Sequence, residues 1–138
     1  MEFTYEEKLA CWKTLASMNG CEISLRIFSP ELRPGSTKVE LAAEVIQQVE
    51  KMRARIETVL LAELYPIYLD SWADDGAPAV DKTAFVASLV LNALHLDVED
   101  ESQASIFLYY DDSQLFGGHG VEVFWDGTED EINVEIVG

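Results

Sequence analysis

Basic side chains are nearly absent from the second part of this 138-residue sequence. Beyond Arg55 only Lys82 is basic, against eighteen carboxylates, and the formal net charge of the chain is −17. A small domain stays soluble with a net charge of about 2 to 8 in magnitude, so solubility does not require this excess. A strongly negative surface repels nucleic acid and speeds the encounter with cationic partners. The charge argues against nucleic-acid binding and indicates either a basic protein partner or a solvated surface without a partner.

Cysteine, long apolar runs and a leader-like N-terminus are also lacking. Two cysteines, Cys11 and Cys21, are too few for a disulfide framework. The longest apolar runs fall far short of the ~20 residues that a membrane helix needs. Residues 1–7 contain neither the basic nor the apolar segment of a signal peptide. We therefore expect a cytoplasmic protein that does not bind a membrane.

Apolar residues are plentiful, at 49% of the chain. A chain of this length buries about two thirds of its unfolded surface, which is enough for one core. No repeat, linker or low-complexity tract divides the sequence, so we expect a single α+β domain over residues 1–138.

The first part of the sequence predicts a β-hairpin and two helices. Asn19-Gly20 is a strong hairpin turn signal, and it would place Met18 opposite Cys21 and Trp12 opposite Ile27. Thr37 and Glu40 match a capping box, and apolar residues then recur every three or four positions. This pattern predicts a helix from about Lys38 through Trp72, bent or restarted at Pro66. Asp81 caps a second, shorter helix that runs to about Asn92.

The C-terminal part predicts an antiparallel β-meander. Apolar residues alternate with polar ones from Leu94 to Val98, and residues 106–110 are apolar on both faces, as in a central strand. Two further strands follow at residues 121–125 and 132–136. The register that places all their apolar residues on one face pairs Trp125 with Ile132, Val123 with Val134 and Val121 with Ile136.

Residue types found in active sites occur close together near residue 115. Asp111, Asp112, Ser113 and His119 are the types of a hydrolytic triad. They lie within nine positions of one another on one turn, and no nucleophile-elbow pattern surrounds Ser113. We therefore predict that the chain is not an enzyme, and keep a small enzyme or ligand-binding domain using the His119 turn as the alternative.

Metal and cofactor motifs give no match. The segment from Asp126 to Glu131 is acidic, but the sixth and twelfth positions of an EF-hand loop would be Glu131 and Val137. His95 and His119 are too few for a zinc site, and no paired-cysteine spacing is present. We expect no dedicated metal site and no cofactor, with a weak surface calcium site in the acidic loop as the alternative.

A glycine-rich segment follows the predicted central strand. Gly117 and Gly118 permit a positive φ angle, and no phosphate-binding pattern surrounds them. We expect a structural turn formed by Gly117, Gly118 and His119, in which the His119 ring donates or accepts a hydrogen bond.

The order of these motifs resembles a bacterial family of domains of unknown function. Tyr109-Tyr110-Asp111-Asp112, then Leu115-Phe116-Gly117-Gly118-His119, then two strands and a final glycine, match its C-terminal signature. The similarity is clearest from about Thr83 to Gly138. The chain departs from the signature at Gly120 and Val121, where the family more often has a hydroxyl or small residue and then Ile. The resemblance implies a small bacterial protein, and more loosely a likeness to immunity proteins that neutralise toxins.

These observations lead to a hypothesis about function. We expect an immunity or antitoxin-like protein that binds and neutralises a basic toxin domain, with a housekeeping domain lacking a specific partner as a further alternative. The oligomeric state is left open. The expected contacts lie in acidic loops, which include residues 97–101, with exposed aromatic anchors such as Tyr110. The expected partner-binding residues are Asp74, Asp75, Asp111, Asp112, Trp125, Asp126, Glu129, Asp130 and Glu131.

Overall fold

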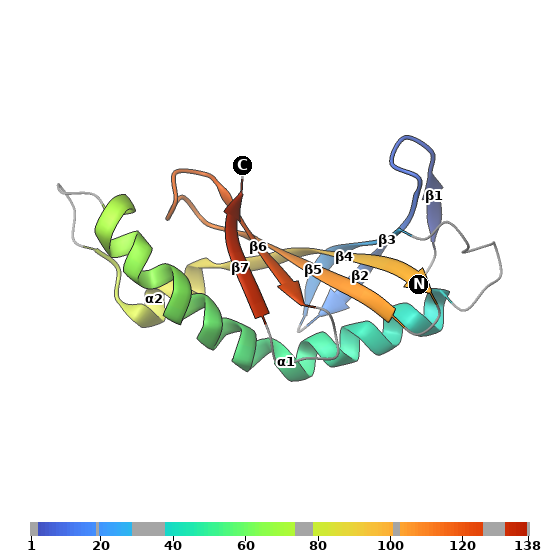
Figure 1. Ribbon diagram of the computed structural model, residues 1–138, viewed down its shortest axis with the longest axis horizontal. Coiled ribbons are helices and arrows are strands. Elements are labelled where there is room, and N and C mark those ends of the chain that lie inside the picture. The colour runs from blue at the N-terminus through green and yellow to red at the C-terminus, as the bar shows by residue number, and fades with distance from the viewer. Residues whose placement is uncertain are drawn as a thin grey trace.

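The computed structural model describes residues 3–18, 20–28, 38–73, 79–100, 103–125 and 132–137, with the backbone alone at 38–42, 98–100, 103 and 104. Their elements follow in chain order in Figure 1. They are β1 (Thr4–Glu6), β2 (Cys11–Met18), β3 (Cys21–Phe28), α1 (Lys38–Ile67), the π-helical turn η1 (Tyr68–Trp72), α2 (Lys82–Ser88), β4 (Val90–Asp100), β5 (Gln103–Asp111), β6 (Gly120–Trp125) and β7 (Ile132–Val137).

The strands form one seven-stranded sheet in the order β1-β2-β3-β4-β5-β6-β7. Neighbouring strands are antiparallel, except that β3 and β4 are parallel. A parallel pair needs a long crossover, and α1, η1 and α2 supply it. The fold class is α+β, as expected. The expected hairpin and meander are two parts of the same sheet, and β1 was not predicted because three residues carry too little periodicity.

The strand registers agree with the sequence pattern. In the N-terminal hairpin Met18 pairs with Cys21 and Trp12 with Ile27. In the C-terminal hairpin the three predicted pairs, which begin with Trp125 and Ile132, are all present. Both registers place apolar side chains on the same face of the sheet, because a shift by one residue would turn them to the other face. The two cysteines are not bonded to each other.

The long helix α1 lies along one face of the sheet (Figure 1). Its buried residues recur at helical spacing: Val45, Val49, Ile56, Leu60 and Leu64. Pro66, which lacks an N–H, lies at the end of α1, and the chain then widens into η1, closed by a hydrogen bond from Ala73 N–H to the Tyr68 carbonyl (2.7 Å). The helical segment thus extends through Trp72, as expected.

The second helix is shorter than predicted. Asp81 caps α2 by accepting a hydrogen bond from Ala84 N–H (2.8 Å), and Phe85 is buried, both as expected. The helix ends at Ser88, and not near Asn92, because Leu89 is extended and Val90 already pairs with Asp111 of β5. Residues 90–94 suit a helix or a strand by composition, and the pairing with β5 decides between them.

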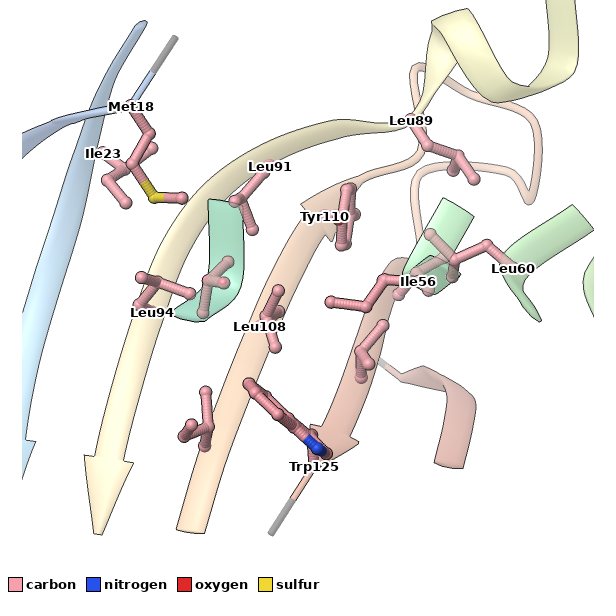
Figure 2. Packing of buried hydrophobic residues seen from close by; sticks show 14 of the residues in the cluster. Met18, Ile23, Ile56, Leu60, Leu89, Leu91, Leu94, Leu108, Tyr110 and Trp125 are labelled. Atoms are coloured by element: carbon pink, nitrogen blue, oxygen red, sulfur yellow. The ribbon is translucent and has the colours of Figure 1, made fainter. Parts of the chain in front are cut away.

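The core lies between α1 and the sheet. Figure 2 shows Leu94, Leu108 and Trp125 of the sheet in the same buried cluster as Ile56 and Leu60 of α1. Full burial of one such aliphatic side chain contributes about 1.5–3 kcal/mol. The cluster therefore fixes α1 to this face of the sheet.

Candidate functional site

The segment from Asp111 to His119, here called the Asp112 turn, joins β5 to β6 and is organised by one carboxylate. Asp112 is 2% exposed. Its Oδ1 accepts a hydrogen bond from Gln114 N–H (3.1 Å), and its Oδ2 accepts from Phe116 N–H (2.9 Å) and Gly118 N–H (3.1 Å). Three backbone donors compensate the burial of the charge, since hydrogen bonds to an ionised carboxylate are the stronger kind.

The backbone of the Asp112 turn is unusual. Gly117 and Gly118 have positive φ angles, of 66° and 89°. Two residues with side chains, Ser113 (48°) and Gln114 (71°), also have positive φ angles. Non-glycine residues rarely adopt this region, and such residues cluster at functional sites. The Ser113 hydroxyl donates to the Ser88 carbonyl (2.7 Å), which fixes the turn to the end of α2.

Trp72 packs against this turn from η1. Its ring lies edge-to-face with Phe116 (5.8 Å between centroids) and with His119 (5.5 Å). A Cβ atom at Gly117 would lie 3.3 Å from Cζ3 of Trp72, so the indole approaches the backbone closely only because residue 117 is glycine. Phe116 is fully buried and contacts Phe85 and Tyr68 in turn. A chain of aromatic contacts therefore holds Trp72 against the core.

Trp72 is nevertheless 38% exposed, and acidic residues occur in both of the segments that meet at its ring. Asp70 lies in the same π-helical turn, and Asp111 begins the Asp112 turn; both are exposed. Asp74 and Asp75 follow Trp72 in the sequence. We define the Trp72 site as Asp70, Trp72, Asp111 and His119. It combines a large rigid aromatic surface with negative charge, which suits the binding of a cationic surface.

Two expected aromatic anchors are not accessible. Trp125 is 5% exposed, and Tyr110 is also buried; both lie in the cluster of Figure 2. Burial raises the pKa of Tyr110 to about 12. The expectation that these two aromatics are exposed is wrong, because both project from the sheet toward α1. The exposed tryptophan is Trp72, which sequence reasoning placed only at the end of a helix.

The acidic residues expected at the interface differ in their positions. Asp111 and Asp97 are exposed. Asp112 is buried and accepts hydrogen bonds from the backbone of its own turn, so it does not belong to the exposed acidic surface. The other residues, Asp74, Asp75, Asp126, Glu129, Asp130 and Glu131, lie outside the described residues.

The expected hydrogen bond of the His119 ring is not present among the described residues. The ring instead packs on Trp72, and the His119 N–H donates to the Phe116 carbonyl (3.3 Å). The hydrogen bonds of the Asp112 carboxylate, and not one of the His119 ring, hold the turn. The residues considered for a hydrolytic triad do not hydrogen-bond to one another through their side chains in the way a triad requires. The Ser113 hydroxyl donates to the Ser88 carbonyl, and Asp112 accepts from backbone N–H groups.

The described part of the chain contains no cluster of three or more His, Cys, Asp or Glu side chains that could hold a metal ion. The acidic loop considered for calcium lies outside it. Within the same described ranges, neither helix has a stretch long and apolar enough to cross a bilayer.

By its fold, the chain is an α+β protein with a mixed sheet, one face of which packs on a long helix. The model of DUF2262, a family described as uncharacterized and conserved in bacteria, matches residues 1–136. The chain therefore belongs to this bacterial family, which agrees with the resemblance of its motifs. Neither the curated proteins nor the solved structures give a significant match.

Proposed function

We propose that this protein is an acidic interaction protein of the immunity or antitoxin type, which binds a basic toxin domain in the bacterial cytoplasm and neutralises it. The proposal starts from the charge. With a net charge of −17 and only Lys82 as a base beyond Arg55, the protein attracts cationic surfaces from a distance.

The Trp72 site is the observation that carries the proposal. Binding energy at protein interfaces concentrates in a few aromatic and arginine side chains seated in fixed positions. Trp72 is exposed, yet Phe116, His119 and the close approach to Gly117 fix its ring before binding. Because the ring is already ordered, a partner loses little conformational freedom of this side chain on docking.

Acidic residues in η1 and in the Asp112 turn, the two segments that meet at Trp72, give the site its charge preference. Asp70 and Asp111 are exposed, and the nearby Asp112 charge is compensated by its own turn. Lysine and arginine side chains of a partner would pair with Asp70 and Asp111, and an arginine or lysine would stack on the indole. A toxin that acts on nucleic acid or anionic substrates carries such a cationic surface, and covering it blocks the reaction.

The test begins with the basic protein encoded beside this gene in the native bacterium, purified as an inactive variant. We expect binding with a rate of association that falls as salt rises, since screening at 0.15 M ionic strength acts over about 8 Å. Trp72→Ala should weaken binding about 30-fold, the effect of losing about 2 kcal/mol at an anchor. Tyr5→Ala is the matched control, because Tyr5 is an exposed aromatic on β1.

Charge reversal is tested in the same assay. Asp70→Lys with Asp111→Lys should slow association far more than Glu44→Lys with Glu50→Lys, two exposed positions on α1. Stopped-flow kinetics and toxicity rescue on co-expression are the measurements. A neutral or acidic partner, or binding that ignores both Trp72→Ala and salt, would contradict the proposal.

A further inference from the structure

The two helices form an open groove on the surface of the protein. α2 packs against α1, and a groove of about 550 Å³ lies between them. Its apolar wall consists of Leu61 of α1, Val86 of α2 and Leu89, which follows α2. Sites that bind small molecules have volumes of about 300–1,000 Å³ and combine apolar walls with a few polar groups. The groove is therefore large enough for a small ligand.

Basic side chains meet in this groove, although the protein as a whole is strongly acidic. Arg53 of α1 and Lys82 of α2 both line it, and Glu57 is the one carboxylate among its described lining residues. Lys82 is also the only base beyond Arg55 in a chain of net charge −17. The other acidic residues of the two helices and of the α2 cap whose side chains are described do not line the groove: Glu44, Glu50, Glu63 and Asp81. Two bases and one acid leave the described lining with one net positive charge.

Polar atoms without a partner lie at the α1 wall of the groove. Nη2 of Arg53 lies 3.5 Å from Oε1 of Glu57, but Arg53 Nε is buried and has no hydrogen-bond partner among the described residues. The hydroxyl of Tyr110, a residue that is 2% exposed, has none either. Burial is the main influence on the pKa of Tyr110, and the charges of Arg53 and Glu57 also act on it, so the hydroxyl lies within electrostatic reach of both.

These groups lack an acceptor. An arginine side chain has five N–H donors and no acceptor, a lysine has donors only, and a tyrosine hydroxyl can donate or accept. The single described carboxylate of the groove, Glu57, is already in contact with Arg53. A buried donor without an acceptor destabilises a protein, so a ligand that brings acceptor oxygens is favoured at this wall.

We propose that the groove between α1 and α2 binds a small organic monoanion, a carboxylate with a short apolar tail. The carboxylate accepts hydrogen bonds from Arg53 and Lys82, and the tail packs on Leu61, Val86 and Leu89. A carboxylate matches the planar donor geometry of a guanidinium group. One net positive charge suits a monoanion, whereas a phosphate dianion would leave excess negative charge in an already acidic protein. This site goes beyond toxin binding and does not depend on it.

The first test compares three probes that differ in head group or tail: hexanoate, hexylammonium and acetate. Each is titrated into the full chain at 0.15 M ionic strength, where charges farther than about 8 Å are largely screened. Hexanoate should bind with a Kd of about 1 mM, since few atoms contact an open groove. Acetate should bind more weakly because it has no tail, and hexylammonium should not bind because its head group is cationic.

NMR spectroscopy gives the location of the probe as well as its affinity. The Nε–H signal of Arg53 and the backbone amides of α2 should move as hexanoate is added. Absence of hexanoate binding at about ten times the expected Kd would overturn the proposal. Equal binding of hexylammonium would do so as well, and so would shifts confined to residues outside the groove.

The second test removes the proposed donors. Lys82→Gln and Arg53→Gln should each weaken hexanoate binding about tenfold, the effect of losing a charge-assisted hydrogen bond. Lys51→Gln is the matched control, because Lys51 is exposed on α1 and does not line the groove. Lys82 is also exposed, so its replacement leaves the core intact. Undiminished binding by Lys82→Gln would show that the head group is not held there.

The third test fills the groove without changing its charge. Ala87 lines the groove and Ala84 does not, and both are exposed on α2. Ala87→Phe should abolish hexanoate binding and keep the far-UV spectrum, whereas Ala84→Phe should bind as the wild type does. Capture of a basic partner should be the same in both variants, so the two proposals can fail independently. Hexanoate binding that survives in Ala87→Phe would overturn this site.

Discussion

At the scale of single residues, Asp112 is the one buried acidic side chain in the part of the chain that the structure describes. It accepts three backbone hydrogen bonds, and it holds a turn in which Ser113 and Gln114 adopt positive φ angles. Its sequence neighbour Asp111 is exposed and accepts from Ser113 N–H (3.0 Å). Of these two adjacent aspartates, Asp112 therefore stabilises the turn, whereas Asp111 contributes negative charge to the surface.

Asp112→Ala is therefore expected to destabilise the protein by about 3 kcal/mol, because three N–H groups lose a charged acceptor. Asp111→Ala, the control, should cost less than about 1 kcal/mol. Urea unfolding of both variants measures the free energies. Equal effects of the two substitutions would show that the turn does not depend on the buried carboxylate.

His95 gives the protein a pH dependence of definite sign. Because burial and Arg26 lower its pKa below 6.5 in the folded state, the unfolded chain binds the proton more readily. The contribution of His95 to the free energy of unfolding is then fully present above pH 6.5. It is lost as the pH falls toward the folded-state pKa of His95. His95→Phe should flatten the melting temperature between about pH 7 and 5.5, above the range where carboxylates titrate. An unchanged slope would contradict the assignment.

At the scale of elements, α2 depends on its cap. The helix has seven residues, too few to be stable alone, and the Asp81 carboxylate accepts a hydrogen bond from the free N–H of Ala84 in its first turn. The preceding segment is held by Tyr65, whose hydroxyl donates to the Val80 carbonyl (2.8 Å), and by Val80 N–H, which donates to the Tyr68 hydroxyl (3.2 Å).

Asp81→Ala should lower the free energy of unfolding by about 1 kcal/mol, whereas Asp81→Asn should leave it nearly unchanged, because asparagine caps equally well. Hydrogen exchange of the Ala84 amide is the local measurement. Equal exchange in the two variants would mean that packing of Phe85, and not the cap, maintains the helix.

The sequence predicted those elements in which local pattern and burial agree. The register of β6 and β7 followed from alternation alone, and Asp81 was identified as a cap. The end of α2 was missed, because residues 90–94 suit either state until β5 pairs with them. Asp112 was misplaced for a related reason, since nothing in the residue type distinguishes a carboxylate that binds its own backbone from one that faces water.

At the scale of the whole molecule, the parallel pairing of β3 with β4 was beyond the reach of local patterns. It joins Phe28 to Asp97 across the entire helical crossover. The Trp72 site has the same origin: Trp72 and Gly117 are 45 positions apart in the sequence, and only the closed fold brings them into contact. The exposure of Trp72 cannot be inferred from any single segment.

The crossover also sets an order of events during synthesis. The ribosome completes α1, with Val49, Ile56 and Leu60 on its inner face, before β4, β5 and β6 exist to cover it. Only the β2–β3 hairpin is available by then. In the nascent chain the apolar face of α1 is therefore exposed, and accessible to chaperones and proteases, until the last third of the polypeptide has been synthesised. The segment that completes the core is also the most acidic part of the chain, so the newly exposed surface repels neighbouring copies while folding finishes.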